Sequence, residues 1–257
     1  MPFGTPVEGH ALAVEIGSTD FNLDNVPSIR TVLNCCQGLV VVDKEGSIVR
    51  LVHFTLREYL SGRSDLFQKC HSVMAETCLA YLNSQQVMNI SATQFLGVQT
   101  VPFLEYSALH WGTHAKKELS DNAKSLALKL FVQYDNHISV RLLLESRHIY
   151  RSRDYPRFTG LHCASFFGLV EVVRSLIEAG GFDINQGDPV GITPLGWAAR
   201  EGHEEVVWLL LGQGGVPPDG SGWSGRTPLS CAAMNGHEQC SQRARPMVGR
   251  PIGRRPG

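Results

Sequence analysis

The sequence lacks the long apolar run, the charge excess and the cysteine motifs that mark several large classes of protein. No apolar run approaches the roughly 18 residues of a membrane span. The opening MPFGTPVEGHALAVEIG has no basic segment followed by an apolar core, so it does not resemble a secretory signal. The formal net charge of the 257 residues is −1, which disfavours nucleic acid or a membrane surface as partner. The seven cysteines form no CxxC pair, so we expect reduced thiols in a cytoplasmic or nuclear protein.

The motifs of common enzymes and metal sites are missing as well. The sequence contains neither GxxxxGK[ST], whose loop and lysine hold nucleotide phosphates, nor GxSxG, which presents a nucleophilic serine. His110 and His114 have the spacing of a metal-binding pair, but HExxH would need glutamate where Trp111 stands. A second group of possible metal ligands is better explained by a sequence unit that recurs in this part of the chain. This group is Cys231, His237 and Cys240. We therefore expect no catalytic residue, no metal and no cofactor.

The N-terminal part shows a helix followed by a β-hairpin. Apolar residues recur at helical spacing over 24–36, and Gly38 ends this pattern. The runs GLVVVD (38–43) and SIVRLVHF (47–54) are rich in β-branched residues and are joined by a short turn with glycine. Two such runs predict a β-hairpin.

A second helix is predicted directly after the hairpin. Thr55 and Glu58 have the spacing of a capping box, in which each side chain bonds a free backbone N–H at a helix start. Helix, hairpin and helix in this order form the later part of a winged helix, a shape often used on DNA. However, residues 1–60 hold four Lys or Arg against seven Asp or Glu, a net charge of −3 that repels phosphate. A protein-packing module is favoured over a DNA-binding regulator.

The middle of the chain, residues 63–150, has the pattern of an α-helical linker region. Further helices are predicted at 101–115, 122–134 and 138–145. Their short connections indicate a bundle or an irregular solenoid. The segment DLFQKCHSVMAETCLAYL places apolar residues along one predicted stripe: Leu66, Cys70, Val73, Cys78 and Leu82.

One sequence unit recurs at a fixed interval in the last part of the chain, with copies that begin at Thr159, Thr193 and Thr227. Threonine caps a helix, proline fits its first turn and glycine suits the left-handed residue after its end. Each copy therefore predicts two helices, the second of which buries its apolar side against the next copy. The positions that recur in register after these threonines are Leu161, Leu195 and Leu229, and Gly168, Gly202 and Gly236.

The best copy, TPLGWAAREGHEEVVWLLL (193–211), resembles the ankyrin repeat. The usual length of that repeat, about 33 residues, is close to the spacing between Thr159, Thr193 and Thr227. Gly196 replaces the usual histidine of that signature, whereas the first copy keeps it as His162. The resemblance implies an ankyrin-repeat α-solenoid over 151–240, with two full repeats and a truncated third. VRLLLE (140–145) also matches the second helix of the first copy and indicates a degenerate half-repeat.

The front half resembles a different segment type. CQGLVVVD (36–43) and VRLVHFTLREYL (49–60) are similar to the winged helix that follows the nucleotide-binding NACHT module in large ankyrin-repeat signalling proteins, common in fungi. The same segment is called the inositol-deacylase winged helix. PFLEYSALHWGTHA (102–115) resembles the helical linker of these proteins. The resemblance implies a mainly α chain with a partial winged helix at 1–62 and the NTPase module missing.

Residues 241–257 differ from all preceding segments in composition. They hold five Arg, three Pro, three Gly and no acidic residue, which predicts a disordered tail. A basic tail of this kind is typical of nucleic-acid contacts or nuclear localisation. The alternative is a truncated or frame-shifted end of the third repeat.

These features together indicate a non-catalytic protein–protein interaction scaffold, with a protein partner on the ankyrin face and no membrane or small-molecule ligand. The first alternative is a regulatory and sensing C-terminal fragment of a NACHT-type signal-transduction NTPase, and the second is a DNA-binding regulator. Exposed aromatic residues would be anchors for a partner, but either phenylalanine of the set could instead fill a gap between repeats. The candidate protein-binding residues are Phe166, Phe167, Arg200, Glu201, Trp223 and Asn235.

Overall fold

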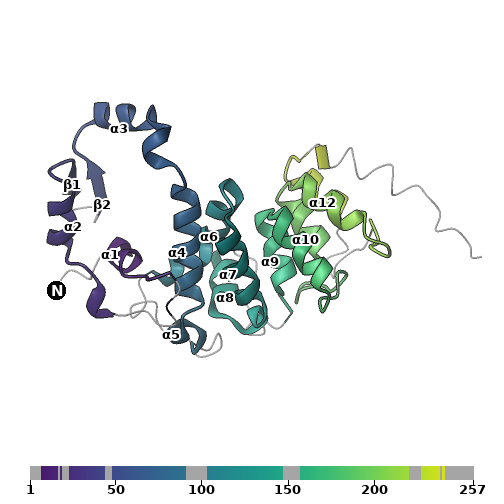
Figure 1. Ribbon diagram of the computed structural model, residues 1–257. Helices are drawn as coiled ribbons and strands as arrows, with labels where there is room; N and C mark the ends of the chain where they lie inside the picture. The colour runs from purple at the N-terminus through teal and green to yellow at the C-terminus, as the bar shows by residue number, and fades with distance from the viewer. Residues whose placement is uncertain are drawn as a thin grey trace, which may run out of the picture. The chain divides into compact units, whose positions relative to one another are not determined.

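The computed structural model of the protein describes residues 7–16, 18, 23–43, 48–90, 103–146, 157–219, 227–237 and 239–240. These residues are mainly helical and contain one two-stranded sheet (Figure 1). The chain divides into two compact units, Met1–Leu126 and Ala127–Gly257. The dividing point falls inside the predicted helical linker region, and the four-part division of the sequence stays a prediction. None of the described helices is both long and apolar enough to cross a membrane.

The first unit begins with short elements. The helix predicted over 24–36 is confirmed in its later part only. Helical conformation is disfavoured directly before Pro27, and the Ser28 hydroxyl caps the helix by accepting the backbone N–H of Thr31 at 3.1 Å. Gly38, with φ +78°, follows its end. The elements are α1 (Val7–Leu12), the 3-10 turn η1 (Leu23–Asn25), α2 (Ile29–Cys35), β1 (Val40–Asp43), β2 (Ile48–Leu51) and α3 (Phe54–Ser61).

The predicted β-hairpin is confirmed. β1 and β2 pair antiparallel, with Val40 opposite Leu51 at one end and Asp43 opposite Ile48 at the other (Figure 1). The joining residues 44–47 lie outside the described part of the chain. The order helix, hairpin, helix is therefore present, whereas its assignment to a winged helix stays a prediction.

The capping box predicted at Thr55 and Glu58 is wrong. The N-cap of α3 is His53, whose Nδ1 accepts the backbone N–H of Thr55 at 3.3 Å and lies 2.8 Å from the Thr55 hydroxyl. Thr55 is already inside the helix, so its side chain does not take the capping position. The helix ends at Gly62, as the glycine there predicts.

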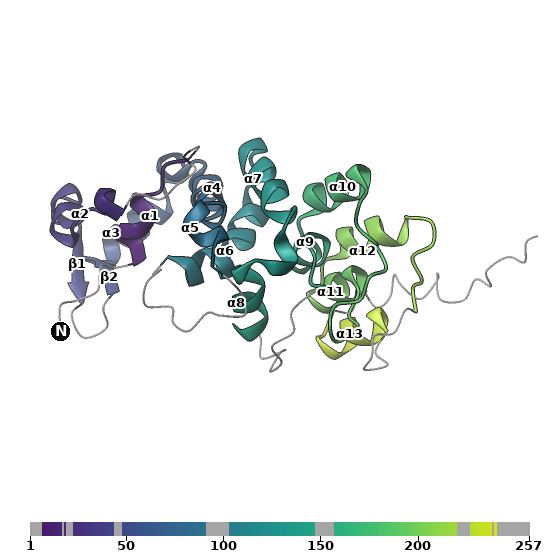
Figure 2. The ribbon, with the colours of Figure 1, turned by 90° about the horizontal axis from the view of Figure 1, so that it is seen from below.

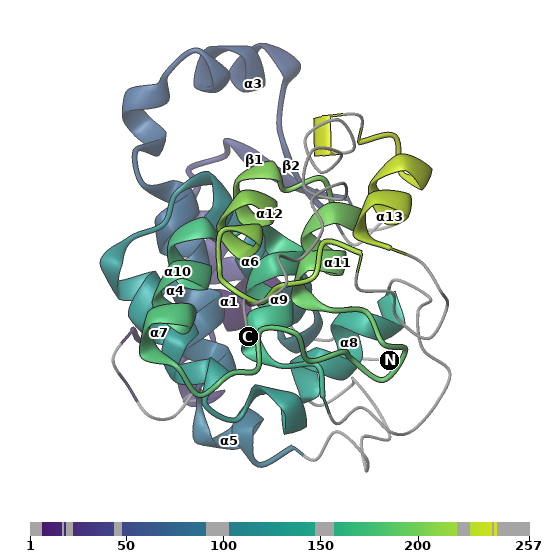
Figure 3. The same cartoon turned by 90° about the vertical axis from the view of Figure 1, so that its right-hand side faces the viewer.

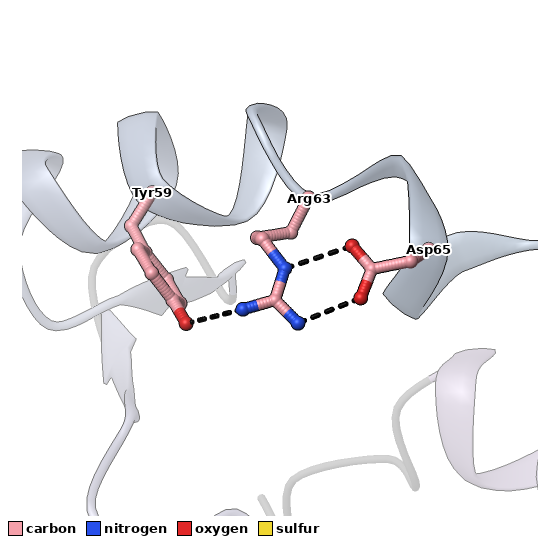
Figure 4. Close-up of polar contacts among 3 residues, drawn as sticks. All are labelled: Tyr59, Arg63 and Asp65. Carbon is pink, nitrogen blue, oxygen red and sulfur yellow. Dashed lines mark hydrogen bonds and ion pairs between the residues drawn. The ribbon is translucent and has the colours of Figure 1, made fainter.

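An exposed network of polar side chains connects α3 with the 3-10 turn η2 (Ser64–Phe67). Arg63 donates Nε–H and Nη2–H to the two carboxylate oxygens of Asp65, at 2.8 and 2.6 Å, and Nη1–H to the Tyr59 hydroxyl at 2.9 Å (Figure 4). The guanidinium lowers the pKa of Asp65. Since exposed ion pairs add little stability, the network mainly orients the turn.

The centre of the first unit is a helix pair. α4 (Cys70–Leu82) packs against α6 (Leu104–Lys117), and the short α5 (Gln85–Met88) follows α4. The residues that α4 buries include Ala75, Cys78, Leu79 and Leu82, and α6 buries Leu104, Ala108, Trp111 and Ala115.

The apolar stripe predicted around α4 is wrong at three of its five residues. Cys78 and Leu82 are buried, but Leu66, Cys70 and Val73 are exposed. Leu66 belongs to η2, and Lys69, with φ +64°, separates that turn from α4. Val73 and Cys78 are separated by clearly more than one helical turn and less than two, so they lie on different faces of α4.

The other predicted helices are confirmed, with their ends shifted by a few residues. They are α6, α7 (Asp121–Phe131) and α8 (Ile138–Ser146), with the 3-10 turn η4 (Tyr134–Asn136) between the last two. α8 contains the VRLLLE match and buries Ile138, Val140, Leu143 and Leu144. Its reading as a half-repeat stays a prediction.

The repeated unit forms helix pairs in the second unit of the chain. The first helices α9, α11 and α13 pack in one row, and the second helices α10 and α12 pack in another (Figure 2 and Figure 3). The hydroxyls of Thr193 and Thr227 accept the N–H groups of Gly196 and Ser230, each at 3.2 Å, as the capping prediction requires. The bounds are α9 (Gly160–Phe167), α10 (Val170–Ala179), α11 (Pro194–Arg200), α12 (Glu204–Leu211) and α13 (Pro228–Met234).

The third copy is described through its first helix and a little beyond. Cys240 is buried, with 4% of its surface exposed. The tail predicted to be disordered, 241–257, lies outside the described residues, as does Trp223.

Candidate functional site

Apart from Trp223, the predicted binding residues stand at equivalent places, at the carboxyl ends of the first helices. The regular interval between copies makes Phe166, Arg200 and Met234 equivalent, and the following residues Phe167, Glu201 and Asn235 form a second set. The structure places each pair at the end of α9, α11 or α13. The pairs differ sharply in chemistry and in exposure.

The expectation that Phe166 and Phe167 are exposed anchors is corrected. Their exposed fractions are 4% and 6%. The rings meet edge to face at 5.0 Å, and Phe166 meets Trp197 of the next repeat edge to face at 5.6 Å. These rings therefore fill the gap between two repeats, the alternative left open by the sequence.

Arg200 and Glu201 remain partly accessible. Arg200 lies with its guanidinium carbon 5.3 Å from the centre of the Trp197 ring, a cation–π contact. Its Nε is 3.9 Å from the Glu201 carboxylate, a long ion pair. The side chains are 32% and 23% exposed. Trp197 thus covers one side of the Arg200 guanidinium, and the rest of this charged group stays open to a partner.

The third pair is the most exposed. Met234 is 62% exposed, and the exposed Asn235 donates its side-chain N–H to the carbonyl of Cys231 at 2.8 Å. Sequence reasoning did not single out Met234, although the equivalence with Arg200 marks its position. Flexible methionine side chains suit adaptable contact surfaces.

Before the amino end of α11, a tight loop is fixed by Asp188. One carboxylate oxygen accepts the N–H groups of Val190 and Ile192 at 3.0 and 2.8 Å, and the other accepts the indole N–H of Trp197 at 3.1 Å. Asp188 is only 3% exposed. Asp188 was not predicted as an anchor, although aspartate before proline, with Gly191 shortly after, is a turn signal.

A second anchor holds the same loop from the preceding repeat. His162 Nδ1 accepts the N–H of Thr159 at 3.1 Å, so its proton is on Nε2, which donates to the carbonyl of Gln186 at 3.0 Å. Burial lowers the pKa of His162 to about 4, so the ring is neutral in this arrangement. The second copy has Gly196 here and cannot make such a bond. Trp197 instead bonds Asp188, in the same loop that His162 holds.

Consecutive repeats also touch where the glycine of one copy meets the histidine of the next. His203 Nε2 donates to the carbonyl of Phe166 at 2.8 Å. A Cβ atom on Gly168 would lie 2.6 Å from the His203 ring, and one on Gly202 would lie 2.5 Å from the His237 ring. The repeated glycines are therefore required for close approach as well as for their positive φ.

Two buried cysteines of the described residues are held as thiols. Burial raises the pKa of the Cys78 thiol to about 12 and raises that of Cys163 further, which opposes thiolate formation. Cys163 donates to the Tyr134 hydroxyl at 3.0 Å. Within the described ranges, no three His, Cys, Asp or Glu side chains are placed to hold one metal ion.

Comparison with known proteins agrees with the repeat geometry. A family model described as ankyrin repeats, in three copies, matches residues 161–243. No curated protein matches the chain. The match begins within α9 and includes both helix rows described above. Residues 161–243 are ankyrin repeats.

Proposed function

We propose that the protein is a non-catalytic scaffold that binds a protein partner through the carboxyl ends of α11 and α13. The observation that carries the proposal is the contrast among equivalent positions. The first pair, Phe166 and Phe167, is buried between repeats, whereas Arg200 and Met234 keep exposed surface at the same places in the following repeats.

The support from physical chemistry is the mixture of rigid and adaptable groups on this surface. The end of α11 is held by packing and by Trp197, whose indole N–H bonds Asp188 and whose ring lies against Arg200. On this rigid base, Arg200 offers a charge and Met234 an apolar side chain. Preorganised surfaces lose less conformational entropy on binding.

The proposal is tested with the full chain as bait and quantitative identification of what it captures. A double variant, Arg200→Ala with Met234→Ala, removes the exposed groups of the proposed surface. The matched control, Arg174→Ala with Trp208→Ala, removes an exposed arginine and an exposed large apolar residue from the second helices α10 and α12.

Partners bound through the proposed surface are expected to fall at least tenfold with the first variant and to stay with the control. Equal capture by wild type and both variants would show that the helix ends are not the binding surface. Equal loss with both variants would point to a general effect on folding, which circular dichroism of the two proteins would reveal.

The alternative of a regulatory fragment of a NACHT-type NTPase has one observation in its favour. None of the side chains that the structure describes between residues 23 and 69 is buried. Exposed large apolar groups of this kind favour packing against further protein. Those exposed by 47% or more include Leu39, Val41, Val52, Phe54 and Tyr59.

The transcript from the native locus tests this alternative. A reading frame that continues upstream into GxxxxGK[ST] is the expected result for the fragment. Coexpression with that upstream segment should then reduce hydroxyl-radical labelling of Phe54 and leave labelling of Met234 unchanged. A reading frame without a phosphate loop would count against it.

A further inference from the structure

Two histidines connect the central helices of the first unit. Nδ1 of His71, in the first turn of α4, lies 2.8 Å from Nδ1 of His114, near the end of α6. The ring centres are 5.1 Å apart and the ring planes are inclined by 35°. Both side chains are half-buried. This contact joins residues that are 43 positions apart in the chain.

The bond between two like atoms restricts where the protons are. One Nδ1 must carry a proton and donate it, and the other must present a lone pair. The second nitrogen of His114, Nε2, lies 2.9 Å from the Tyr106 hydroxyl, which donates or accepts according to the tautomer. The pair is therefore satisfied when both rings are neutral.

One added proton leaves the bond in place. It binds Nε2 of the donor ring, which becomes an imidazolium and still donates from Nδ1 to the neutral ring. Such a charge-assisted bond is stronger than the neutral one. A second added proton must bind Nδ1 of the acceptor ring. Two N–H groups then face each other, and two cations repel at the same place.

Neighbouring basic groups add to this repulsion at His114. His110 and Lys117 of α6 disfavour a charge on His114, and the pKa of His114 is lowered by burial and by repulsion from His71, His110 and Lys117. Nearby acids already have hydrogen-bond donors. Glu118 accepts the N–H of Ser72 at 3.2 Å. Glu76 accepts from the side chains of Ser72, Ser120 and Asn122.

We propose that His71 and His114 form an acid-sensitive latch between α4 and α6, which holds with no added proton or one and opens with the second. The latch acts at the amino end of α4, where the N–H of Val73 bonds the carbonyl of Lys69 at 2.9 Å. Opening the latch frees this first turn. The buried contacts of Cys78, Leu79 and Leu82 lie farther along α4 and stay closed.

Imidazole NMR titration of the full chain tests the proposal. The two rings are expected to titrate in two steps whose apparent proton affinities differ at least tenfold, because they share one site. In His71→Asn, the His114 ring should titrate in a single step. The control His110→Asn removes a neighbouring imidazole and leaves the pair, so its two steps should remain.

Amide hydrogen exchange gives a second readout that does not depend on assigning ring protons. After correction for intrinsic rates, protection of the first turn of α4 should fall at least tenfold through the second step. In His71→Asn, protection should be flat over the same pH range. A common single midpoint for both wild-type rings would overturn the proposal. So would an identical acid loss of protection in wild type and His71→Asn.

Discussion

The imidazole of His203 occupies the space that any side chain at Gly168 would need, and its Nε2 donates to the carbonyl of Phe166 at 2.8 Å. One contact thus joins the end of the first repeat's α9 to the start of the second repeat's α12. The same contact recurs one copy later, where the His237 ring occupies the space beside Gly202. The recurrence of the glycine, and of the histidine after it in the second and third copies, therefore has a direct physical reason.

Gly168→Ala should destabilise the repeats more than the same change at Gly236. Both glycines have positive φ, +73° and +76°, and alanine there costs about 1 kcal/mol for the left-handed backbone. At Gly168 the new methyl group would also meet His203, adding about 1–3 kcal/mol of overpacking. Urea unfolding followed by tryptophan fluorescence measures the difference.

Gly236 is the matched control because no atom of the described residues lies within 4 Å of the place where its Cβ would be. Similar free energies of unfolding for the two variants would mean that the His203 contact yields without cost. The present explanation of the Gly-His pattern would then be wrong.

Arg157→Gly should stabilise the protein. Arg157 has φ +118° and stands one repeat interval before Gly191, whose φ is +80°. A non-glycine residue in this region carries about 1–3 kcal/mol of strain. Part of the relief is lost because glycine makes the unfolded chain more flexible, so the expected net gain is about 1 kcal/mol in the free energy of unfolding.

The reverse change gives the control for Arg157. Gly191→Ala should destabilise by about 1 kcal/mol or more, since it introduces a side chain at a positive φ. An unchanged or lower stability of Arg157→Gly, measured by the same urea titration, would show that the arginine side chain makes contacts that outweigh the strain.

Ser165→Ala should also stabilise the protein. The Ser165 hydroxyl is fully buried and has no hydrogen-bond partner among the residues that the structure describes. The equivalent residues of the next copies are Ala199 and Ala233. Removing an unsatisfied buried hydroxyl should gain about 1–3 kcal/mol.

The neighbouring repeat supplies the reciprocal test for Ser165. Ala199 is 3% exposed, so Ala199→Ser should lose stability of the same order. If both variants lose stability, the hydroxyl of Ser165 is bonded in solution and the prediction fails.

The fold was predictable from the sequence where the pattern is periodic. The repeat places Thr193, Gly202 and their equivalents correctly, because each fills a backbone role that few residues can fill. The hairpin was predictable from its two β-branched runs. The helix at 24–36 was predicted too long, since the effect of Pro27 on the preceding backbone was not considered.

Side-chain environments were harder to predict than elements. His53 replaced the expected Thr55 cap because imidazole Nδ1 accepts an N–H as a hydroxyl oxygen does. Phe166 was expected at an exposed variable position, yet Trp197 from the next repeat covers it. Such burial depends on contacts between copies. The pattern within one copy does not contain this information.

The protonation of His162 should make the ankyrin repeats acid-labile. Its pKa is lowered to about 4 in the folded protein, against about 6.5 in the unfolded chain. Between these values the unfolded state binds more protons, so stability is fully present above pH 6.5 and falls as the pH falls toward 4. The shift corresponds to about 3 kcal/mol, since one pKa unit is about 1.4 kcal/mol.

The variant His162→Asn separates this effect from general acid denaturation. It loses the neutral imidazole that bonds Thr159 and Gln186, so it should be less stable than wild type at pH 7. Its free energy of unfolding should then change less between pH 6.5 and pH 4. Urea titrations at both pH values measure this change in the free energy of unfolding for wild type and for the variant. If the free energy of unfolding changes equally in wild type and variant, the His162 ring is already protonated, or can be protonated, without losing its two bonds. In the structure, protonation must break the bond to the Thr159 N–H, because Nδ1 is then a donor facing a donor.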